Sequence, residues 1–132
     1  MPIRTLIVDD EKPARDELAF LLKGFNEIEL IGQAKNGLEA IHLVKEHSPD
    51  LLFLDVQMPG LDGFGVIKKL VDRKTKVPHV VFATAFDQYA VNAFEVNAVD
   101  YVLKPFEKAR IGKAIARARK AMEAEQPTLE KL

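Results

Sequence analysis

Residues 51–63 read LLFLDVQMPGLDG, a short apolar run followed by an aspartate and several turn-forming residues. The run from Leu51 to Leu54 shows no alternation between apolar and polar residues, which is typical of a strand buried on both faces of a parallel sheet. Asp55 follows this run directly, and Met58, Pro59 and Gly60 then predict a turn. The segment therefore predicts a buried strand that carries a carboxylate at its carboxyl end.

Four further segments have the composition of strands. Three are apolar runs of the same kind, and the fourth is more polar, as an edge strand would be: 6–8, 80–82 and 101–103, and then Ile28–Ala34. Between the strands, apolar residues recur at helical spacing in five segments: 13–23, 38–47, 63–74, 88–96 and 107–124.

Strand and helix thus alternate five times along the chain. This alternation predicts βαβ units with right-handed crossovers, which build a parallel sheet covered by helices on both faces. We expect an α/β fold with a doubly wound five-stranded parallel sheet in the order 2-1-3-4-5 and with five helices.

The composition narrows the class of protein. The chain has 132 residues, which suits one domain, and its formal net charge of −1 provides no overall attraction to DNA or to an anionic membrane. It has no cysteine, so disulfides and thiolate metal sites are excluded. No apolar stretch is long enough for a signal peptide or a membrane span, and we expect a cytoplasmic protein.

Three aspartates follow strands. Asp9 and Asp10 come directly after the first strand, and Asp55 comes after the third. With the strand order 2-1-3-4-5, these two strands flank the switch point, where ligands of open α/β sheets bind. Each acid alone is as easily a loop residue or a helix N-cap, but their joint arrangement favours a site. Clustered carboxylates suit a divalent cation, and oxygen ligands suit Mg²⁺.

Two other polar residues end strands. Thr84 ends the fourth strand, and Lys104 follows the fifth strand and precedes Pro105. Taken alone, the hydroxyl is more often a cap and the lysine a solvated charge. Beside a carboxylate and metal site, they would supply a hydrogen-bond donor and a cation for phosphoryl oxygens.

These residues belong to motifs that closely resemble the receiver domains of two-component response regulators. The motifs are VDDE at 8–11, FLDVQMPGLDG at 53–63, FATA at 82–85 and YVLKPF at 101–106. The resemblance covers nearly the whole chain and implies the flavodoxin-like receiver fold. It assigns residues 1–122 to a receiver domain and residues 123–132 to a tail or linker toward an effector domain.

The resemblance implies specific roles at the acidic cluster. Asp55 would be the nucleophile that accepts a phosphoryl group from a phosphohistidine on a sensor histidine kinase. Asp10 and Asp55 would bind Mg²⁺ through their side chains and Gln57 through its backbone carbonyl, whereas Asp9 would act through a bound water. The domain would catalyse only its own phosphoryl transfer and dephosphorylation and would not be an enzyme for other substrates.

The resemblance also implies how the site is read out. Lys104 would pair with the phosphoryl group or with Asp55, and its peptide bond to Pro105 would be cis. Thr84 and Tyr101 would form the switch pair: the hydroxyl moves toward the phosphoryl group while the aromatic ring moves inward.

Residues 86–106 read FDQYAVNAFEVNAVDYVLKPF and carry a finer resemblance, to receivers of the LytTR class (the LytR/AlgR type). The residues that carry it are Phe86, Tyr89, Ala90, Ala93, Phe94 and Glu95. The alternative is that these side chains only pack a helix. The LytTR class implies a C-terminal DNA-binding domain and transcription regulation, so contact with DNA would be made only by a part outside these residues.

The last predicted helix is strongly basic. It carries Lys108, Arg110, Lys113, Arg117, Arg119 and Lys120, with no acid between them. We interpret this as a solvated helix face rather than a nucleic-acid or membrane patch. In receivers, the face made by the last two helices and the strand between them commonly mediates dimerisation, so it is a candidate homodimer contact.

The sequence therefore favours a phosphorylation-controlled switch that uses Asp55 and Mg²⁺. Two alternatives stay open. The chain could be a stand-alone or phosphorylation-independent interaction module. A magnesium-dependent phosphohydrolase is less well supported, because its usual Asp-x-Asp pair after the first strand is missing.

Overall fold

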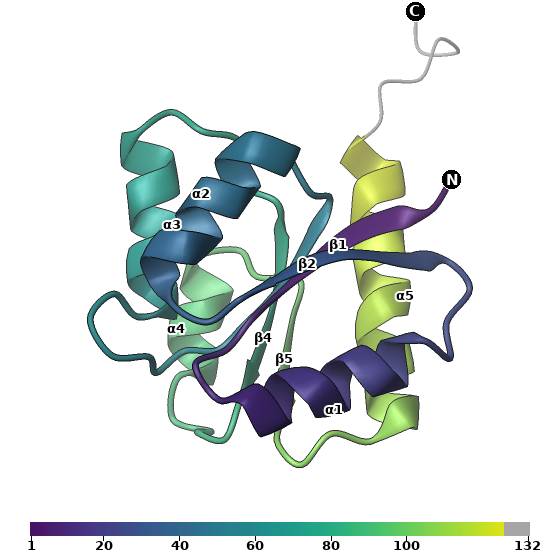
Figure 1. The fold of residues 1–132 in the computed structure, drawn as a ribbon. Coiled ribbons are helices and arrows are strands. Elements are labelled where there is room, and N and C mark those ends of the chain that lie inside the picture. The colour runs from purple at the N-terminus through teal and green to yellow at the C-terminus, as the bar shows by residue number, and fades with distance from the viewer. Residues whose placement is uncertain (126–132) are drawn as a thin grey trace, which may run out of the picture.

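The computed structural model describes residues 1–125, which form an alternating series of strands and helices around one sheet (Figure 1). The elements in chain order are β1 Ile3–Val8, α1 Lys12–Leu22, β2 Ile28–Ala34, α2 Gly37–His47, β3 Leu51–Leu54, α3 Gly63–Asp72, β4 His79–Thr84, α4 Ala90–Glu95, β5 Asp100–Leu103 and α5 Lys108–Glu125.

The five strands form one parallel sheet in the order β2-β1-β3-β4-β5, which confirms the predicted fold. α1 and α5 cover one face of the sheet, and α2, α3 and α4 cover the other (Figure 1). β2 is an edge strand, and most of its residues are only partly buried, as its polar composition predicts.

Successive residues of the inner strands enter opposite layers of the core. In β1, Leu6 and Val8 pack with the α2–α4 layer, whereas Ile7 packs with α1 and α5. All four residues of β3 are fully buried. Because both faces of these strands need apolar side chains, their sequences show no alternation. Polar side chains of these strands therefore gather mainly where the strands end.

The turn after β3 holds Asp55 in place. The Asp62 side chain caps α3 by accepting a hydrogen bond from the Gly65 amide at 2.8 Å. Gly63 begins α3 so close to β3 that a Cβ atom there would lie 2.4 Å from the carbonyl oxygen of Asp55. Any side chain at Gly63 would therefore displace the backbone of Asp55.

Two helices differ from the sequence prediction. α5 continues to Glu125, one residue beyond the predicted helix of residues 107–124 and three residues into the predicted tail of residues 123–132; residues 126–132 lie outside the described part of the chain. α4 has only six residues, and of these only Ala93 is buried. Phe94, which the helical pattern counts as a packing residue, is 82% exposed because so short a helix directs little of its surface at the sheet.

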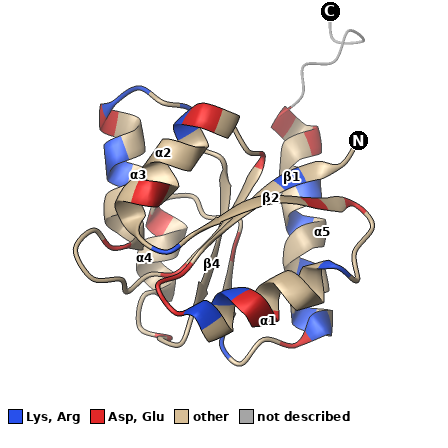
Figure 2. Cartoon of the chain, viewed as in Figure 1, with Lys and Arg blue, Asp and Glu red and all other residues tan. Residues whose placement is uncertain are grey.

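The sequence analysis interpreted the basic residues of the last helix as a solvated face. This was wrong in part, because several of them contact acids. Arg110 and Arg117 contact the buried Asp100 of β5 at 2.7 and 3.0 Å, and Arg119 pairs with Glu27 at 3.4 Å. Figure 2 shows these basic segments along α5. An acid at the start of the neighbouring strand thus neutralises part of the basic helix face.

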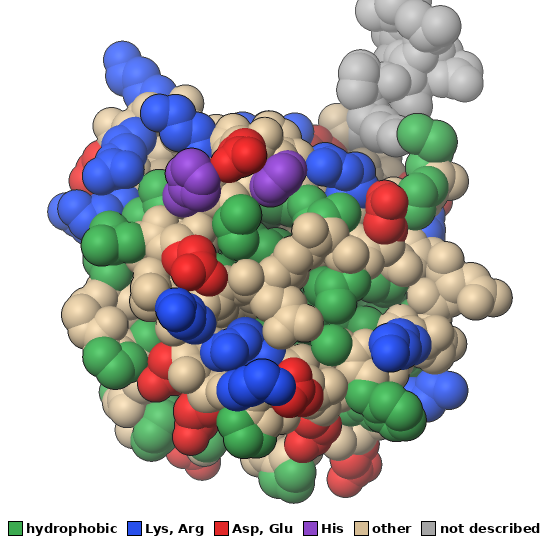
Figure 3. Space-filling view, viewed as in Figure 1, with side chains coloured by type: hydrophobic (Ala, Val, Ile, Leu, Met, Phe, Trp, Pro, Cys, Tyr) green, Lys and Arg blue, Asp and Glu red, His purple; other side chains and the backbone are tan. Residues whose placement is uncertain are grey.

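No helix in the described part of the chain is long and apolar enough to cross a membrane. On the face shown in Figure 3, acidic, basic and hydrophobic side chains are interspersed. This mixed surface agrees with the small net charge.

Candidate functional site

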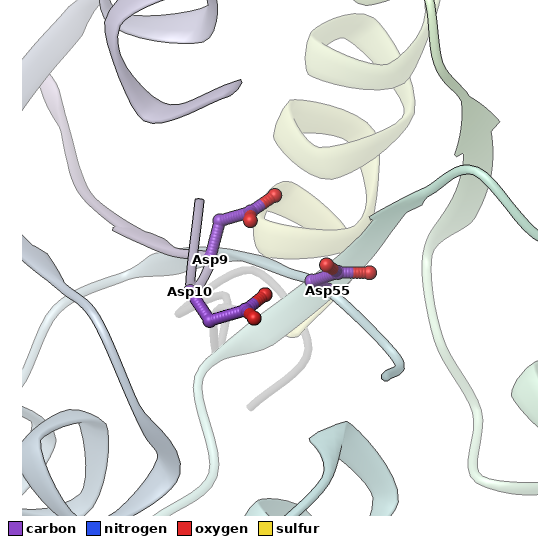
Figure 4. A group of neighbouring side chains, drawn as sticks. All are labelled: Asp9, Asp10 and Asp55. Atoms are coloured by element: carbon purple, nitrogen blue, oxygen red, sulfur yellow. The ribbon is translucent and has the colours of Figure 1, made fainter. Parts of the chain in front are cut away.

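Three carboxylates converge at the carboxyl ends of β1 and β3. Asp9, Asp10 and Asp55 each offer an oxygen that lies within 4.8 Å of the others, and Figure 4 shows the three side chains together. β1 and β3 are hydrogen-bonded neighbours with Val8 opposite Leu54, so the residues that follow them emerge side by side. This is the switch point of the sheet, because β2 lies beyond β1 and β4 lies beyond β3.

Asp55 is the buried carboxylate of the cluster that keeps an oxygen without a partner among the described residues. Its side chain is only 5% exposed, and within residues 1–125 its Oδ1 atom has no hydrogen-bond partner. Burial, and then the negative charge of Asp9, raise the pKa of Asp55 above its ordinary value, while the positive charge of Lys104 opposes this rise. A cation bound nearby would therefore stabilise the charged form of the Asp55 carboxylate.

Asp9 is as buried as Asp55 but is already engaged. Its Oδ1 accepts a hydrogen bond from the Glu11 amide at 2.9 Å, and its Oδ2 contacts Lys104 Nζ at 2.8 Å. Asp10, in contrast, is exposed at the solvent side of the cluster. The three acids therefore differ: one is held by protein donors, one faces solvent and one is buried with a free oxygen.

Lys104 supplies the positive charge of the site. Its Nζ lies 2.8 Å from Asp9, 3.5 Å from Asp55 Oδ2 and 3.5 Å from Glu11. Burial opposes its charged form, but the hydrogen bond to Asp9 and the charge of Asp55 raise the pKa of Lys104 overall. The Lys104–Pro105 peptide bond is cis, as the resemblance implied.

Thr84 and Tyr101 lie on adjacent strands next to the carboxylates. Thr84 is fully buried at the end of β4, and its Oγ1 accepts a hydrogen bond from the Phe86 amide at 3.4 Å. Tyr101 is half-buried in β5, and its hydroxyl donates to the Phe86 carbonyl. Both predicted switch residues therefore hold the same residue of the β4–α4 loop.

Gln57 lies two residues beyond Asp55 with an exposed side chain. Its Nε2 donates a hydrogen bond to the Tyr89 hydroxyl at 2.7 Å. Together with Asp10 and Asp62, these two residues line a hollow of about 560 Å³ beside the acidic cluster. The sequence drew attention to the backbone of Gln57 and gave no sign of this side-chain contact, which joins residues 32 positions apart.

The cluster fits Mg²⁺ by the chemistry of its donors. It offers carboxylate oxygens from Asp10 and Asp55, and the buried Oδ1 of Asp55 has no donor among the described residues. Mg²⁺ takes oxygen ligands, is usually bound by one or two protein carboxylates and keeps several waters. The exposed position of Asp10 leaves room for those waters.

Asp100 is a buried acid outside the cluster, and the sequence did not single it out. The Asp100 side chain is 4% exposed and makes hydrogen bonds to Arg110 at 2.7 and 2.8 Å and to Arg117 at 3.0 Å. Although burial opposes it, these guanidinium contacts and the Tyr101 amide lower the pKa of Asp100. An acid at the start of a buried strand, followed by a basic helix, was the available signal.

The family model for the response regulator receiver domain matches residues 5–116. Among curated proteins, the chain is 48% identical over 117 residues to the transcriptional regulatory protein BtsR of Salmonella typhi, which covers 89% of this chain and 48% of that protein. It is 49% identical over 118 residues to the sensory transduction protein LytT of Bacillus subtilis, with the same coverage. The chain therefore spans about half the length of the curated relatives it matches.

Among solved structures, the chain is also similar to receiver domains of response regulators. The response regulatory domain of mrkE from Klebsiella pneumoniae aligns with a TM-score of 0.81 at 33% identity and covers 92% of this chain and 99% of that one. The REC domain of AraT, a response regulator from Geobacillus stearothermophilus, aligns with a TM-score of 0.82 at 30% identity and covers 96% and 100%. On the extent of the family match and the identity to these relatives, this chain belongs to the response regulator receiver domain family.

Proposed function

We propose that this chain is a phosphorylation-controlled switch in which Asp55 accepts a phosphoryl group from a sensor histidine kinase with the help of Mg²⁺. One observation supports this most directly. Asp55 offers an oxygen within 4.8 Å of oxygens of two other carboxylates, its buried Oδ1 has no hydrogen-bond partner among residues 1–125, and Lys104 Nζ lies 3.5 Å from Oδ2. A buried carboxylate with an unpartnered oxygen lowers the stability of the fold. Its position beside a lysine and two other acids suits reaction with a phosphoryl group.

The proposed reaction is a transfer between two protein side chains. An oxygen of the Asp55 carboxylate attacks the phosphorus of the kinase phosphohistidine, a P–O bond forms and the P–N bond breaks. The imidazole leaves with the electron pair and takes up a proton, and Asp55 becomes an acyl phosphate. Phosphoryl transfer depends mainly on positioning and on charge neutralisation, and Lys104 is close enough to contact the transferred oxygens.

Asp10 and Asp55 would hold Mg²⁺ through their side chains and Gln57 through its carbonyl, whereas Asp9 would act through water. The ion supplies neutralisation of phosphoryl charge. Asp9, which already contacts Lys104 at 2.8 Å, keeps that lysine beside the reacting carboxylate.

The readout would pass through Thr84 and Tyr101. Both contact Phe86, one through its amide and one through its carbonyl. If the Thr84 hydroxyl turns toward a phosphoryl group on Asp55, it releases the Phe86 amide. The β4–α4 loop is then free to shift, and the Tyr101 ring moves inward. New charge at Asp55 would thus bias the position of α4.

The output surface would be the face formed by α4, β5 and α5. Val91, Phe94 and Leu103 are apolar and are 72%, 82% and 45% exposed. Isolated apolar side chains on a surface need no explanation, but three on adjacent elements support a contact with a second copy of the chain. Homodimerisation through this face is the proposed use.

The proposed setting is a cytoplasmic transcription regulator. Two relatives are named a transcriptional regulatory protein and a sensory transduction protein, and this chain spans about half of each. Residues 1–122 would be the receiver domain. Residues 123–132, the first three of which continue α5, would lead toward a LytTR effector domain that makes the contact with DNA.

Incubation with acetyl phosphate and Mg²⁺, followed by intact-mass measurement, tests the proposal. Wild type should gain one phosphoryl group and Asp55→Asn should gain none. Asp72→Asn, at an exposed carboxylate on α3, is the matched control and should behave as wild type. An adduct on Asp55→Asn equal to that on wild type would refute the assignment. Turnover of free phosphomonoesters would favour a phosphohydrolase instead. Self-association or partner binding that is the same with and without phosphorylation would favour a phosphorylation-independent interaction module.

A further inference from the structure

A side-chain hydrogen bond joins the two loops that border the acidic cluster. Gln57, in the loop after β3, donates from Nε2 to the hydroxyl of Tyr89 at 2.7 Å. Tyr89 is the residue directly before α4. The contact therefore links the loop that carries Asp55 to the start of the helix on the proposed output face.

α4 has few other attachments at this end. The side chain of Tyr89, at the N-cap position, makes no capping hydrogen bond to α4. Ala93 is the only buried residue of this helix. The Tyr89 ring lies 6.3 Å from the ring of Phe64 in α3 and 6.4 Å from that of Phe86. Tyr89 thus makes two aromatic contacts and one side-chain hydrogen bond, and that hydrogen bond joins it directly to the loop that carries Asp55.

The two tyrosines of the chain hold opposite ends of the β4–α4 loop. Tyr101 holds the loop near its beginning by donating to the Phe86 carbonyl. Tyr89 holds it at its end through Gln57. These two attachments use different hydrogen bonds, and they meet at Phe86, whose carbonyl accepts from Tyr101 and whose ring lies 6.4 Å from the ring of Tyr89.

We propose that Gln57 is a positioning residue that couples the metal site to α4 through Tyr89, in parallel with Thr84 and Tyr101. The inference rests on the proposed function, because it takes the Gln57 carbonyl as a ligand of Mg²⁺. The side chain bound to Tyr89 restricts how this short segment can turn, and so holds the carbonyl toward Asp10 and Asp55.

Coupling of this kind acts in both directions. If the Tyr89 contact favours the geometry that binds Mg²⁺, then Mg²⁺ must favour the Tyr89 contact by the same factor. Loss of one partly exposed hydrogen bond should weaken Mg²⁺ binding by about two- to tenfold. It should also reduce the response of α4 to the ion.

The test compares Mg²⁺ titrations of the whole chain followed by amide NMR and by calorimetry. In wild type, Mg²⁺ should shift the amides of Tyr89, Val91 and Ala93. Gln57→Ala and Tyr89→Phe should each weaken binding by about two- to tenfold and shrink these shifts, and the double variant should be no worse than either single one. Tyr89→Phe keeps the ring and its contacts with Phe64 and Phe86, which guards against loss of folding.

Gln88→Ala is the matched control, since Gln88 is an exposed glutamine next to Tyr89 and should leave both readings unchanged. Mg²⁺ binding and α4 shifts that are equal in wild type, Gln57→Ala and Tyr89→Phe would overturn the coupling and leave the metal site standing. Additive losses in the double variant would also overturn it. Absence of Mg²⁺ binding in wild type would overturn both the coupling and the proposed metal site.

Discussion

Asp55 and Asp100 are two aspartates with nearly the same burial and opposite surroundings. Their side chains are 5% and 4% exposed. Asp100 receives two guanidinium groups and the Tyr101 amide, and its pKa is lowered. Asp55 keeps one oxygen without a partner among residues 1–125, and its pKa is raised. The first carboxylate holds β5 to α5, whereas the second is left available for a ligand.

The same substitution at these two positions should therefore have opposite effects on stability. Asp100→Asn removes the charge that Arg110 and Arg117 face and should lower the free energy of unfolding by about 2–4 kcal/mol, less than for a fully buried pair because Arg117 is 62% exposed. Urea unfolding at about pH 7 measures the loss. A change within error of zero would show that the Asp100 contacts add nothing to the fold.

Asp55→Asn should instead raise the free energy of unfolding by about 1–3 kcal/mol at neutral pH without Mg²⁺, because it removes a buried, poorly satisfied charge. Because the folded-state pKa of Asp55 is raised, its contribution to stability is present below the unfolded pKa of about 3.9 and is lost as the pH rises through the folded pKa. The gain of the variant over wild type should therefore grow as the pH rises.

The gain should disappear in acid, where both side chains at position 55 are neutral. Asp100 should show the reverse trend: its contribution is present above the unfolded pKa of about 3.9 and is lost as the pH falls through its lowered folded pKa. Urea unfolding of wild type and both variants across the acid range measures the two slopes. Slopes of the same sign would break the contrast between the two sites.

Mg²⁺ should produce the smallest of these changes in stability and should act at only one of the two sites. At ~10 times its dissociation constant, an ion that binds only the folded state stabilises by about 1.4 kcal/mol. Thermal unfolding should show this increment in wild type and in Asp100→Asn, and a smaller one in Asp55→Asn. An equal increment in all three proteins would place the ion away from Asp55.

The contrast also explains what the sequence could predict. The strands, their order and the cluster of Asp9, Asp10 and Asp55 were predictable because a buried parallel strand carries its polar residues mainly at its end, and neighbouring ends meet. The start of β1 was missed, because Arg4 and Thr5 break the apolar run. Thr5 is nevertheless fully buried, since its hydroxyl donates to the Ile3 carbonyl at 3.0 Å.

Contacts that depend on side-chain reach could not be predicted. Asp100 and Arg110 are joined across the turn between β5 and α5, and Gln57 and Tyr89 are 32 residues apart. No local periodicity marks such pairs. The exposure of Phe94 was missed for a related reason: a six-residue helix does not have enough turns for its apolar pattern to decide which side faces the sheet.

The most direct test of the account is to identify the residue that carries the phosphoryl group. After treatment with acetyl phosphate and Mg²⁺, borohydride reduction converts an aspartyl phosphate to homoserine, which peptide mass spectrometry can locate in the sequence. If Asp55 is the phosphorylated residue, homoserine should appear at position 55 and at no other aspartate, with Asp100 untouched. Homoserine at Asp9 or Asp10, or none at position 55 in a folded protein that has gained a phosphoryl group, would contradict it.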